Sequence, residues 1–338
     1  MRTQVVMISL VLLLPMTTFT PVRATDYFVN GTAMSSGDGS DWSEAFVTIG
    51  EATSLAGPGD RVFVAGREAP SPLVYAESIT VASAVELAGG YAPIGAPAII
   101  DRDPARYITI IDGQNINNEV VEIADNATNA TVVDGFTITG GVHHGVKNGD
   151  TSQCQFRSLN FIANGSTPAT SNGAGIHCGD SGSFPRILNC EFSSNKGISG
   201  GAIYCPGDST FRATNCRFIG NEALGGGAVY VAPLTPPSFS EIPPKPLPSI
   251  SGAFTSNQLR HCYFQGNQAT SGDGGTVNFS GEFYAISCQF IGNTAAPGSG
   301  GGVECAFGSL LGVNLEFVSN ATTGHGALTC PQIMYQSL

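Results

Sequence analysis

The chain has 338 residues, of which 42% are hydrophobic and only 12% are charged, against roughly 25% charged residues in an ordinary soluble domain. This composition excludes intrinsic disorder, because disordered chains are rich in charge and poor in the apolar side chains that build a core. The formal net charge of −12 excludes nucleic acid as a partner, since phosphate binding needs a basic surface.

Residues 1–24 have the organisation of a signal peptide. Arg2 gives a positive start, Val5 to Pro15 form an apolar stretch too short to span a bilayer, and Val22-Arg23-Ala24 fits a cleavage site. No later stretch of the sequence is apolar enough for a membrane helix. We therefore expect an exported protein, secreted or at the cell surface, with residues 25–338 as its mature domain and no transmembrane segment after cleavage.

The mature sequence opens with a cap and a series of irregular strands. Apolar side chains recur at three and four residues from Trp42 to Ala56, which predicts an amphipathic helix over 43–56, stopped by Gly57-Pro58-Gly59. We expect residues 25–60 to cap the domain. Apolar runs at 61–66, 84–89, 108–113, 120–123 and 132–138 then predict irregular coils over 61–153.

Two linked motifs recur six times between residues 154 and 330. One is a glycine-rich strand such as Gly200-Gly-Ala-Ile-Tyr-Cys205, and the other is Phe-x-x-Asn. Most copies are about 26 residues apart, but Phe218 and Phe264 are separated by 46 residues because a proline-rich loop, 232–250, is inserted there. The phenylalanines are Phe161, Phe192, Phe218, Phe264, Phe290 and Phe317; the asparagines are Asn164, Asn195, Asn221, Asn267, Asn293 and Asn320.

This repeat decides the predicted architecture. Its short strands alternate apolar and polar residues, and stacking successive repeats in parallel would bury the apolar side chains continuously. Paired glycines exclude helical solenoids, and the period is too short for propeller blades. We predict an all-β fold, a single-stranded parallel β-helix solenoid with a short N-terminal capping helix. The chain stops at Leu338, soon after a repeat strand, so we expect it to be C-terminally truncated or capped by another chain.

Stacking should turn repeated residues into structural columns. We expect the six phenylalanines to form an aromatic stack at the strand spacing of roughly 4.8 Å. We expect the six asparagines to lie at a turn, where they adopt left-handed backbone and bond to the next copy.

Eight of the nine cysteines fall on two inward rows of this repeat. They could form four disulfides between adjacent coils, or they could be small buried apolar residues. No Cys-x-x-Cys occurs, so a zinc site is not expected. The candidate pairs are Cys178 with Cys205, Cys305 with Cys330, Cys190 with Cys216, and Cys262 with Cys288.

The two motifs resemble the repeats of the polymorphic outer membrane proteins. That resemblance covers about residues 154–330 and implies a right-handed parallel β-helix of the pectin-lyase-like superfamily, with a role in adhesion. The segment from Tyr27 to Gly66 is also similar to the opening of many exported bacterial β-helix proteins of unassigned function.

Residues that alternate with the inward row should face outward. They form a candidate binding row of His177, Tyr204, Tyr230, Asn278 and Glu304. Tyrosine rings flanked by amide and acid groups suit an extracellular polysaccharide or another cell-surface component. The alternative is that these are solvated residues with good strand propensity. We expect a non-catalytic binding or adhesion protein.

The other candidate function is a polysaccharide lyase or glycoside hydrolase acting on acidic glycans. Three observations argue against this alternative. Only three lysines are present to supply the basic residue of a lyase. For a hydrolase, Gly324-His325-Gly326 lacks the aspartate motifs that should precede it, and nothing fixes the separation of the carboxyl groups of Glu304 and Glu316. No catalytic residue is assigned and no cofactor is expected. Asp38 and Asp41 could hold calcium, but a polar turn is the preferred explanation of these residues.

Overall fold

The computed structural model describes residues 24–92, 102–166, 169, 171–233, 256–272, 274–324 and 326–335. The predicted signal peptide, apart from Ala24, lies outside the described residues, as do 234–250 of the proline-rich loop, His325 and 336–338.

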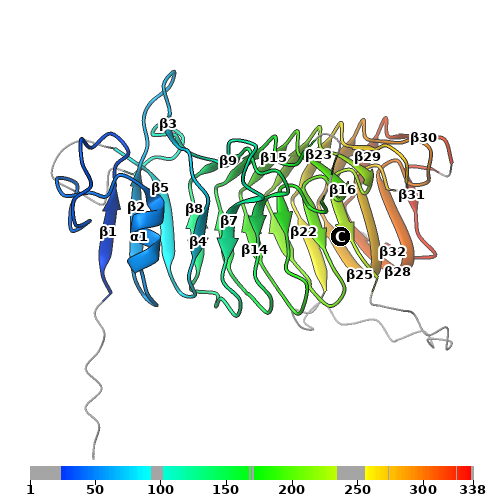
Figure 1. Ribbon diagram of the computed structural model, residues 1–338. Coiled ribbons are helices and arrows are strands. Elements are labelled where there is room, and N and C mark those ends of the chain that lie inside the picture. The colour runs from blue at the N-terminus through cyan, green and yellow to red at the C-terminus, as the bar shows by residue number, and fades with distance from the viewer. Residues whose placement is uncertain are drawn as a thin grey trace, which may run out of the picture.

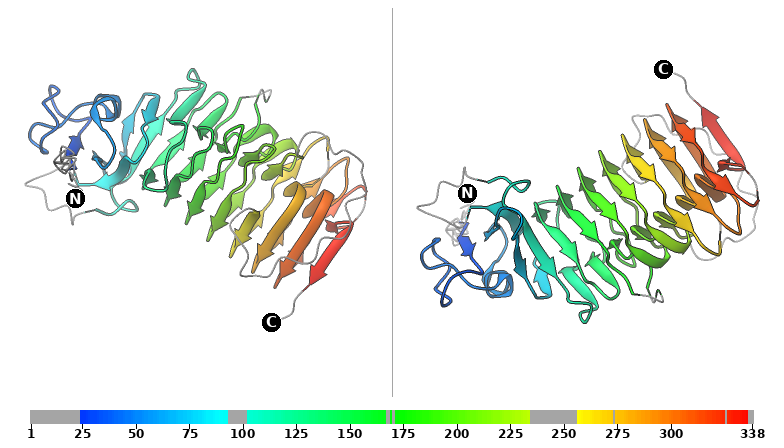
Figure 2. Two further views of the ribbon diagram at one scale, coloured as in Figure 1. Left: turned by 90° about the horizontal axis from the view of Figure 1, so that it is seen from below. Right: turned by 90° about the horizontal axis from the view of Figure 1, so that it is seen from above.

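The chain winds into a parallel β-solenoid of about nine turns (Figure 1). Strands of successive turns lie side by side along the whole molecule (Figure 2), and every strand pair in the described ranges is parallel, isolated bridges aside. The predicted all-β solenoid is therefore confirmed. The described part of the chain contains one short helix, and no helix there is long and apolar enough to cross a membrane.

Three sheets run along the solenoid. The first has 18 strands: β1 (Asp26–Val29), β2 (Arg61–Ala65), β4 (Ile79–Val81), β5 (Glu86–Tyr91), β7 (Glu119–Ile123), β8 (Val132–Asp134), β10 (His144–Lys147), β11 (Gln155–Arg157), β13 (Ile176–His177), β14 (Arg186–Leu188), β17 (Ile203–Cys205), β18 (Arg212–Thr214), β21 (Val229–Val231), β22 (Asn257–Arg260), β25 (Val277–Ile286), β28 (Val303–Val313), β31 (Leu328–Thr329) and β32 (Gln332–Tyr335).

The second sheet has nine strands and the third has five. The second comprises β3 (Leu73–Tyr75), β6 (Thr109–Asp112), β9 (Thr137–Thr139), β12 (Asn160–Ile162), β15 (Glu191–Ser193), β19 (Arg217–Ile219), β23 (Tyr263–Gln265), β26 (Gln289–Ile291) and β29 (Glu316–Val318). The third comprises β16 (Lys196–Ser199), β20 (Glu222–Gly225), β24 (Gln268–Ala269), β27 (Thr294–Ala295) and β30 (Ala321–Thr322).

The 18-stranded sheet consists of two rows of strands. One row runs through β7, β10, β13, β17 and β21, and the other through β8, β11, β14, β18 and β22. Both rows pair with the long strands β25 and β28, which therefore join them. Side chains that face outward from the two rows consequently belong to one continuous sheet.

The predicted capping helix is shorter than the apolar pattern suggested. Helix α1 spans Ile49–Leu55 and packs against β1, β2 and β4. Thr48 caps its N-terminus with a capping box, because its hydroxyl accepts from the Glu51 N–H while the Glu51 carboxylate accepts from the Thr48 N–H. The prediction over 43–48 was wrong, since the Asp41 carboxylate binds the N–H groups of Ser43 and Glu44 and holds a turn there.

The phenylalanine column is continuous from Phe161 to Phe317. Neighbouring ring centroids are 4.5–4.9 Å apart, and the ring planes lie within 2–9° of parallel. Five of the six rings are fully buried, whereas Phe317 is partly buried. The column therefore supplies a large share of the apolar core along the regular repeats.

The asparagine column bonds each turn to the next. The Asn195 amide Nδ2 donates to Asn221 Oδ1 at 2.9 Å, and this contact repeats from Asn164 to Asn320 at 2.8–3.1 Å. The expectation of left-handed backbone at the asparagines was wrong. The left-handed residue is the preceding one, such as Ala163 or Ser194, which leaves each asparagine amide to point into the core.

Candidate ligand-binding surface

The candidate binding row lies on the outward face of the 18-stranded sheet. His177 pairs in register with Tyr204, and Tyr204 with Tyr230. The register continues to Asn278 and Glu304. Parallel pairing without an offset places these side chains one above another along the solenoid axis.

Aromatic rings are neighbours over four turns, with three of them on this row and His144 beside it. The His144 and His177 ring centroids are 5.1 Å apart, those of His177 and Tyr204 are 5.3 Å apart, and those of Tyr204 and Tyr230 are 5.9 Å apart. The two tyrosine planes differ by only 19°. The His177 and Tyr204 planes, by contrast, are tilted by 41°. The tyrosine pair therefore offers a near-parallel aromatic surface along the axis, on which sugar rings can stack.

The two ends of the predicted row differ in accessibility. Tyr204 and Tyr230 are half-buried, and the His177 side chain is 12% exposed. Asn278 and Glu304 are only 8% and 9% exposed. Tyr204 and Tyr230 are therefore the part of the row that a ligand can reach, and we call them, together with the adjoining His177, the aromatic strip.

The row extends further toward the N-terminus than the sequence pattern indicated. Lys147 pairs with His177 in register, and Glu122 pairs with Lys147. The Lys147 Nζ and Glu122 Oε1 atoms are 3.8 Å apart. A weak signal was present, because Gly145-Val-Lys147 matches Gly175-Ile-His177, but the irregular spacing of the early coils concealed it.

The aromatic strip is electrically neutral at physiological pH. Burial lowers the pKa of His177, and the nearby Lys147 charge lowers it further, against the opposing effect of Asp180. Burial lowers the pKa of His144 to about 3. Both imidazoles are therefore uncharged near pH 7 and present ring faces and hydrogen-bonding nitrogens rather than a positive charge.

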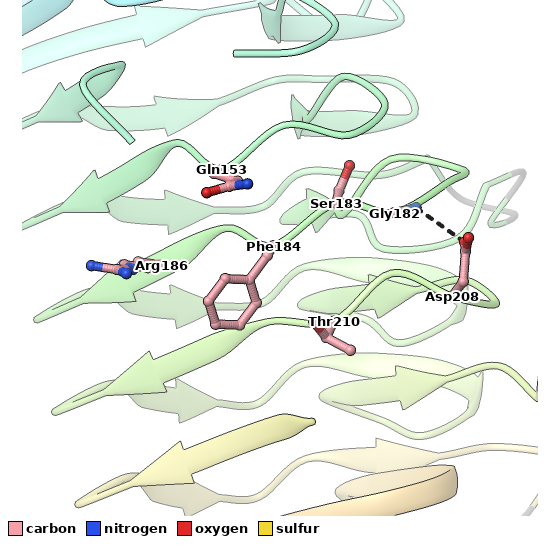
Figure 3. A pocket seen from close by; sticks show the side chains of 7 residues that line it. All are labelled: Gln153, Gly182, Ser183, Phe184, Arg186, Asp208 and Thr210. Atoms are coloured by element: carbon pink, nitrogen blue, oxygen red, sulfur yellow. Dashed lines mark hydrogen bonds between the residues drawn. The ribbon is translucent and has the colours of Figure 1, made fainter. Parts of the chain in front are cut away.

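A cavity of about 460 Å³ opens beside the second row of strands (Figure 3). It is lined by Gln153, Gly182, Ser183, Phe184, Arg186, Asp208 and Thr210. The Asp208 carboxylate accepts a hydrogen bond from the Gly182 N–H at 3.0 Å, which fixes the turn that forms one wall. No repeated motif indicates this cavity, because its walls come from non-repeating turns.

The calcium candidates lie in local turns. Asp38 accepts from the Ser40 N–H, and Asp41 accepts from the Ser43 N–H and hydroxyl. These hydrogen bonds lower the pKa of both carboxyls. In the described ranges, no three His, Cys, Asp or Glu side chains gather in a group that could hold a metal ion.

The two carboxylates considered for hydrolysis belong to different sheets. Glu304 is on β28 of the 18-stranded sheet, and Glu316 is on β29 of the nine-stranded sheet. The Glu316 carboxylate accepts from the Gln289 amide at 2.7 Å. This arrangement gives no observation that favours the hydrolase alternative.

The cysteines of the two inward rows are free thiols in the structure. Cys190, Cys216, Cys262 and Cys288 follow one another along the core, and each side chain contacts the next. Cys178 contacts Cys205, and Cys305 contacts Cys330. The four disulfides therefore stay a prediction, with the thiols placed next to their proposed partners.

One turn of the solenoid matches a known repeat. Residues 189–206, which contain β15, β16 and β17, match the family model of the Chlamydia polymorphic membrane protein repeat. No curated protein and no solved structure gave a significant match. The repeating coil of this β-solenoid thus resembles the repeat of the polymorphic membrane proteins.

Proposed function

We propose that this protein is a surface or outer-membrane-type β-solenoid that acts by binding. Two observations support the proposal: the polymorphic membrane protein repeat at 189–206 and the parallel solenoid fold. A solenoid presents the same side of every turn to solvent, so it offers an extended flat surface suited to polymeric or cell-surface partners. Export through residues 1–24 belongs to the same proposal.

The ligand that fits the aromatic strip is a carbohydrate. The observation that carries this proposal is the in-register column of His177, Tyr204 and Tyr230, whose rings are uncharged and partly exposed. Apolar sugar faces stack on such rings, while tyrosine hydroxyls and imidazole nitrogens exchange hydrogen bonds with sugar hydroxyls.

The test is binding to a glycan array by the native protein and by a Tyr204→Ala/Tyr230→Ala variant. We expect the variant to bind its glycans at least about tenfold more weakly, because each lost stacking contact contributes about 1 kcal/mol. Tyr263→Ala is the control, since Tyr263 faces outward from β23 on a different sheet. Equal binding by the double variant and the native protein would show that the aromatic strip is not the binding site.

A further inference from the structure

A second feature of the outward surface is a row of guanidinium groups. Arg186 on β14 pairs in register with Arg212 on β18. The flanking positions are Gln155 on β11 and Gln258 on β22. Arg157 Nη2 donates to Gln155 Oε1 at 2.8 Å, and Arg260 Nε donates to Gln258 Oε1 at 3.4 Å.

Four consecutive turns therefore each supply one guanidinium. Arg186 and Arg212 are in register, whereas Arg157 and Arg260 lie two residues further along their strands and reach back to the glutamines that are in register with Arg186 and Arg212. Neighbouring strands are roughly 4.8 Å apart, so the four positive groups follow one another closely along the axis. We call Arg157, Arg186, Arg212 and Arg260 the arginine row. All four side chains are half-buried.

The arginine row is unusual for this chain. The sequence has only 14 lysine and arginine residues against 26 acidic ones. Within the described ranges, none of the ion pairs includes Arg157, Arg186 or Arg260. Asp134, which aligns with Arg157, is instead held by Arg102 at 3.0 Å.

Like charges on adjacent strands repel one another. Burial lowers the pKa of Arg212, and the charges of Arg260 and Arg186 lower it further, which reflects the positive potential along the row. A repeated array of guanidiniums fits a ligand with repeated carboxylate or sulfate groups, because arginine binds such oxyanions through two parallel hydrogen bonds.

The cavity beside Arg186 adds an aromatic ring and hydrogen-bonding groups, which a simple anion does not need for binding. Figure 3 shows Phe184 between Arg186 and Asp208, with Thr210 nearby. The Phe184 ring is half-buried and can pack against a sugar face. Asp208 and Thr210 can exchange hydrogen bonds with hydroxyl groups. A positive group, an aromatic ring and a carboxylate in this order suit an acidic sugar better than a phosphate chain.

We propose that the arginine row and the adjoining cavity bind an acidic polysaccharide, one that carries carboxylate or sulfate groups, with its chain along the solenoid axis. The sugar acids pair with the guanidiniums, and one sugar unit enters the cavity against Phe184. This surface is distinct from the aromatic strip, so the proposal does not depend on the function proposed above.

The test is direct binding to polygalacturonate, dextran sulfate and neutral dextran. The native protein should bind one or both acidic polymers and lose affinity as salt rises, while neutral dextran should not bind this surface. The acidic polymer that binds more tightly identifies carboxylate or sulfate as the recognised group. An Arg186→Gln/Arg260→Gln variant should bind at least about tenfold more weakly, since each charge-assisted contact contributes about a factor of ten or more.

The control variant is Arg106→Gln/Arg217→Gln, which changes the net charge equally. Both arginines are exposed and paired with acids elsewhere on the molecule. This control should bind like the native protein. A third variant, Thr214→Glu, should also reduce binding, because it places a carboxylate beside Arg260 without removing an arginine. It keeps the proposal testable if the glutamine variant does not fold, as judged by circular dichroism.

Three results would overturn the proposal. One is absence of binding to both acidic polymers, and another is equal weakening in the control and in the arginine-row variants. The third is tighter binding of a single-stranded DNA oligonucleotide than of either polysaccharide, which would show general attraction of phosphate polymers instead.

Discussion

At the scale of single residues, the buried amides of the asparagine column are stable in this core because they bond to one another and to the backbone. Asn221 Oδ1 accepts from the backbone N–H and the Nδ2 of Asn195, while its own Nδ2 donates to Phe192 O and Asn267 Oδ1. The side chain is fully buried. An amide placed this way costs little to bury, since all its donors and acceptors have partners.

Removing one amide from the column should be costly. We expect Asn221→Ala to lower the free energy of unfolding by about 3 kcal/mol, because it leaves Asn195 and Phe192 with unsatisfied buried groups. Urea denaturation followed by circular dichroism measures the change. Asn160→Ala, at an exposed position on β12, is the control and should change stability by less than about 0.5 kcal/mol. A similar loss in both variants would contradict the role given to the column.

His144 should make the protein sensitive to acid. Burial lowers its pKa to about 3 in the folded protein, whereas its ordinary value is 6.5. As the pH falls below 6.5, the unfolded chain takes up a proton that the folded protein does not, so stability falls progressively until about pH 3.

A His144→Gln variant should lose less stability than the native protein between pH 7 and about pH 4.5, because each pKa unit of difference corresponds to about 1.4 kcal/mol. Urea midpoints at the two pH values provide the measurement. His261→Gln, at an exposed side chain, should behave like the native protein. If His144→Gln loses as much stability in acid as the native protein does, the neutral buried imidazole does not cause the loss of stability at low pH.

At the scale of secondary-structure elements, each turn is shaped by a few repeated bends. One lies before the inward cysteine row, where Asn189, Asn215 and Ser287 adopt left-handed backbone. Another lies before the asparagine column, where Gly220, Gly266 and Gly292 do so, and a Cβ at any of these three glycines would meet open space. Residues with a φ angle near +60° therefore form the corners of the coil, while pairing within the sheets fixes the register of the strands between these corners.

The inward cysteine rows make a prediction at this scale. All of the cysteines except Cys330 are buried, so a thiol reagent should modify them slowly in the native protein near pH 8. After unfolding without a reductant, one reactive thiol would support the four proposed bridges between adjacent turns. Nine reactive thiols would show that these cysteines are buried apolar residues, and rapid modification of the native protein would contradict their burial.

At the scale of the whole molecule, the strands of each described turn pair with those of the adjacent turns. Strand pairing runs from each turn to the next in all three sheets, so stability should be close to a sum over turns and the contacts between adjacent turns. The surface is built in the same way, since both the aromatic strip and the arginine row take one side chain from each turn.

A whole turn should therefore be removable without loss of the fold. Deleting 267–292 brings Asn293 to the place of Asn267, because these two residues are 26 positions apart, the repeat length. We expect a shorter solenoid with a native-like circular dichroism spectrum and a moderately lower melting temperature. Deleting 267–279, half a turn, breaks the register of the core columns and should prevent folding. Equal stability of the two deletions would argue against additive stacking of turns.

The sequence by itself determined the repeat, the parallel solenoid and which side chains point inward. Phe-x-x-Asn and the glycine-rich strand return at the same spacing, and only stacking in register buries all their apolar groups together. The capping helix was overestimated because periodicity alone does not show where a capping box and the Asp41 turn compete with helix.

Only the tertiary structure decided which outward residues form surfaces. It buried Asn278 and Glu304, placed His144 next to His177, and aligned Arg186 with Arg212 beside a cavity. The arginines lie on strands whose outward positions do not repeat a single residue type, so their alignment depends on how each intervening loop closes. Exposure and proximity between turns are set by loops of irregular length, whereas burial in the core is set by a local pattern that the sequence repeats.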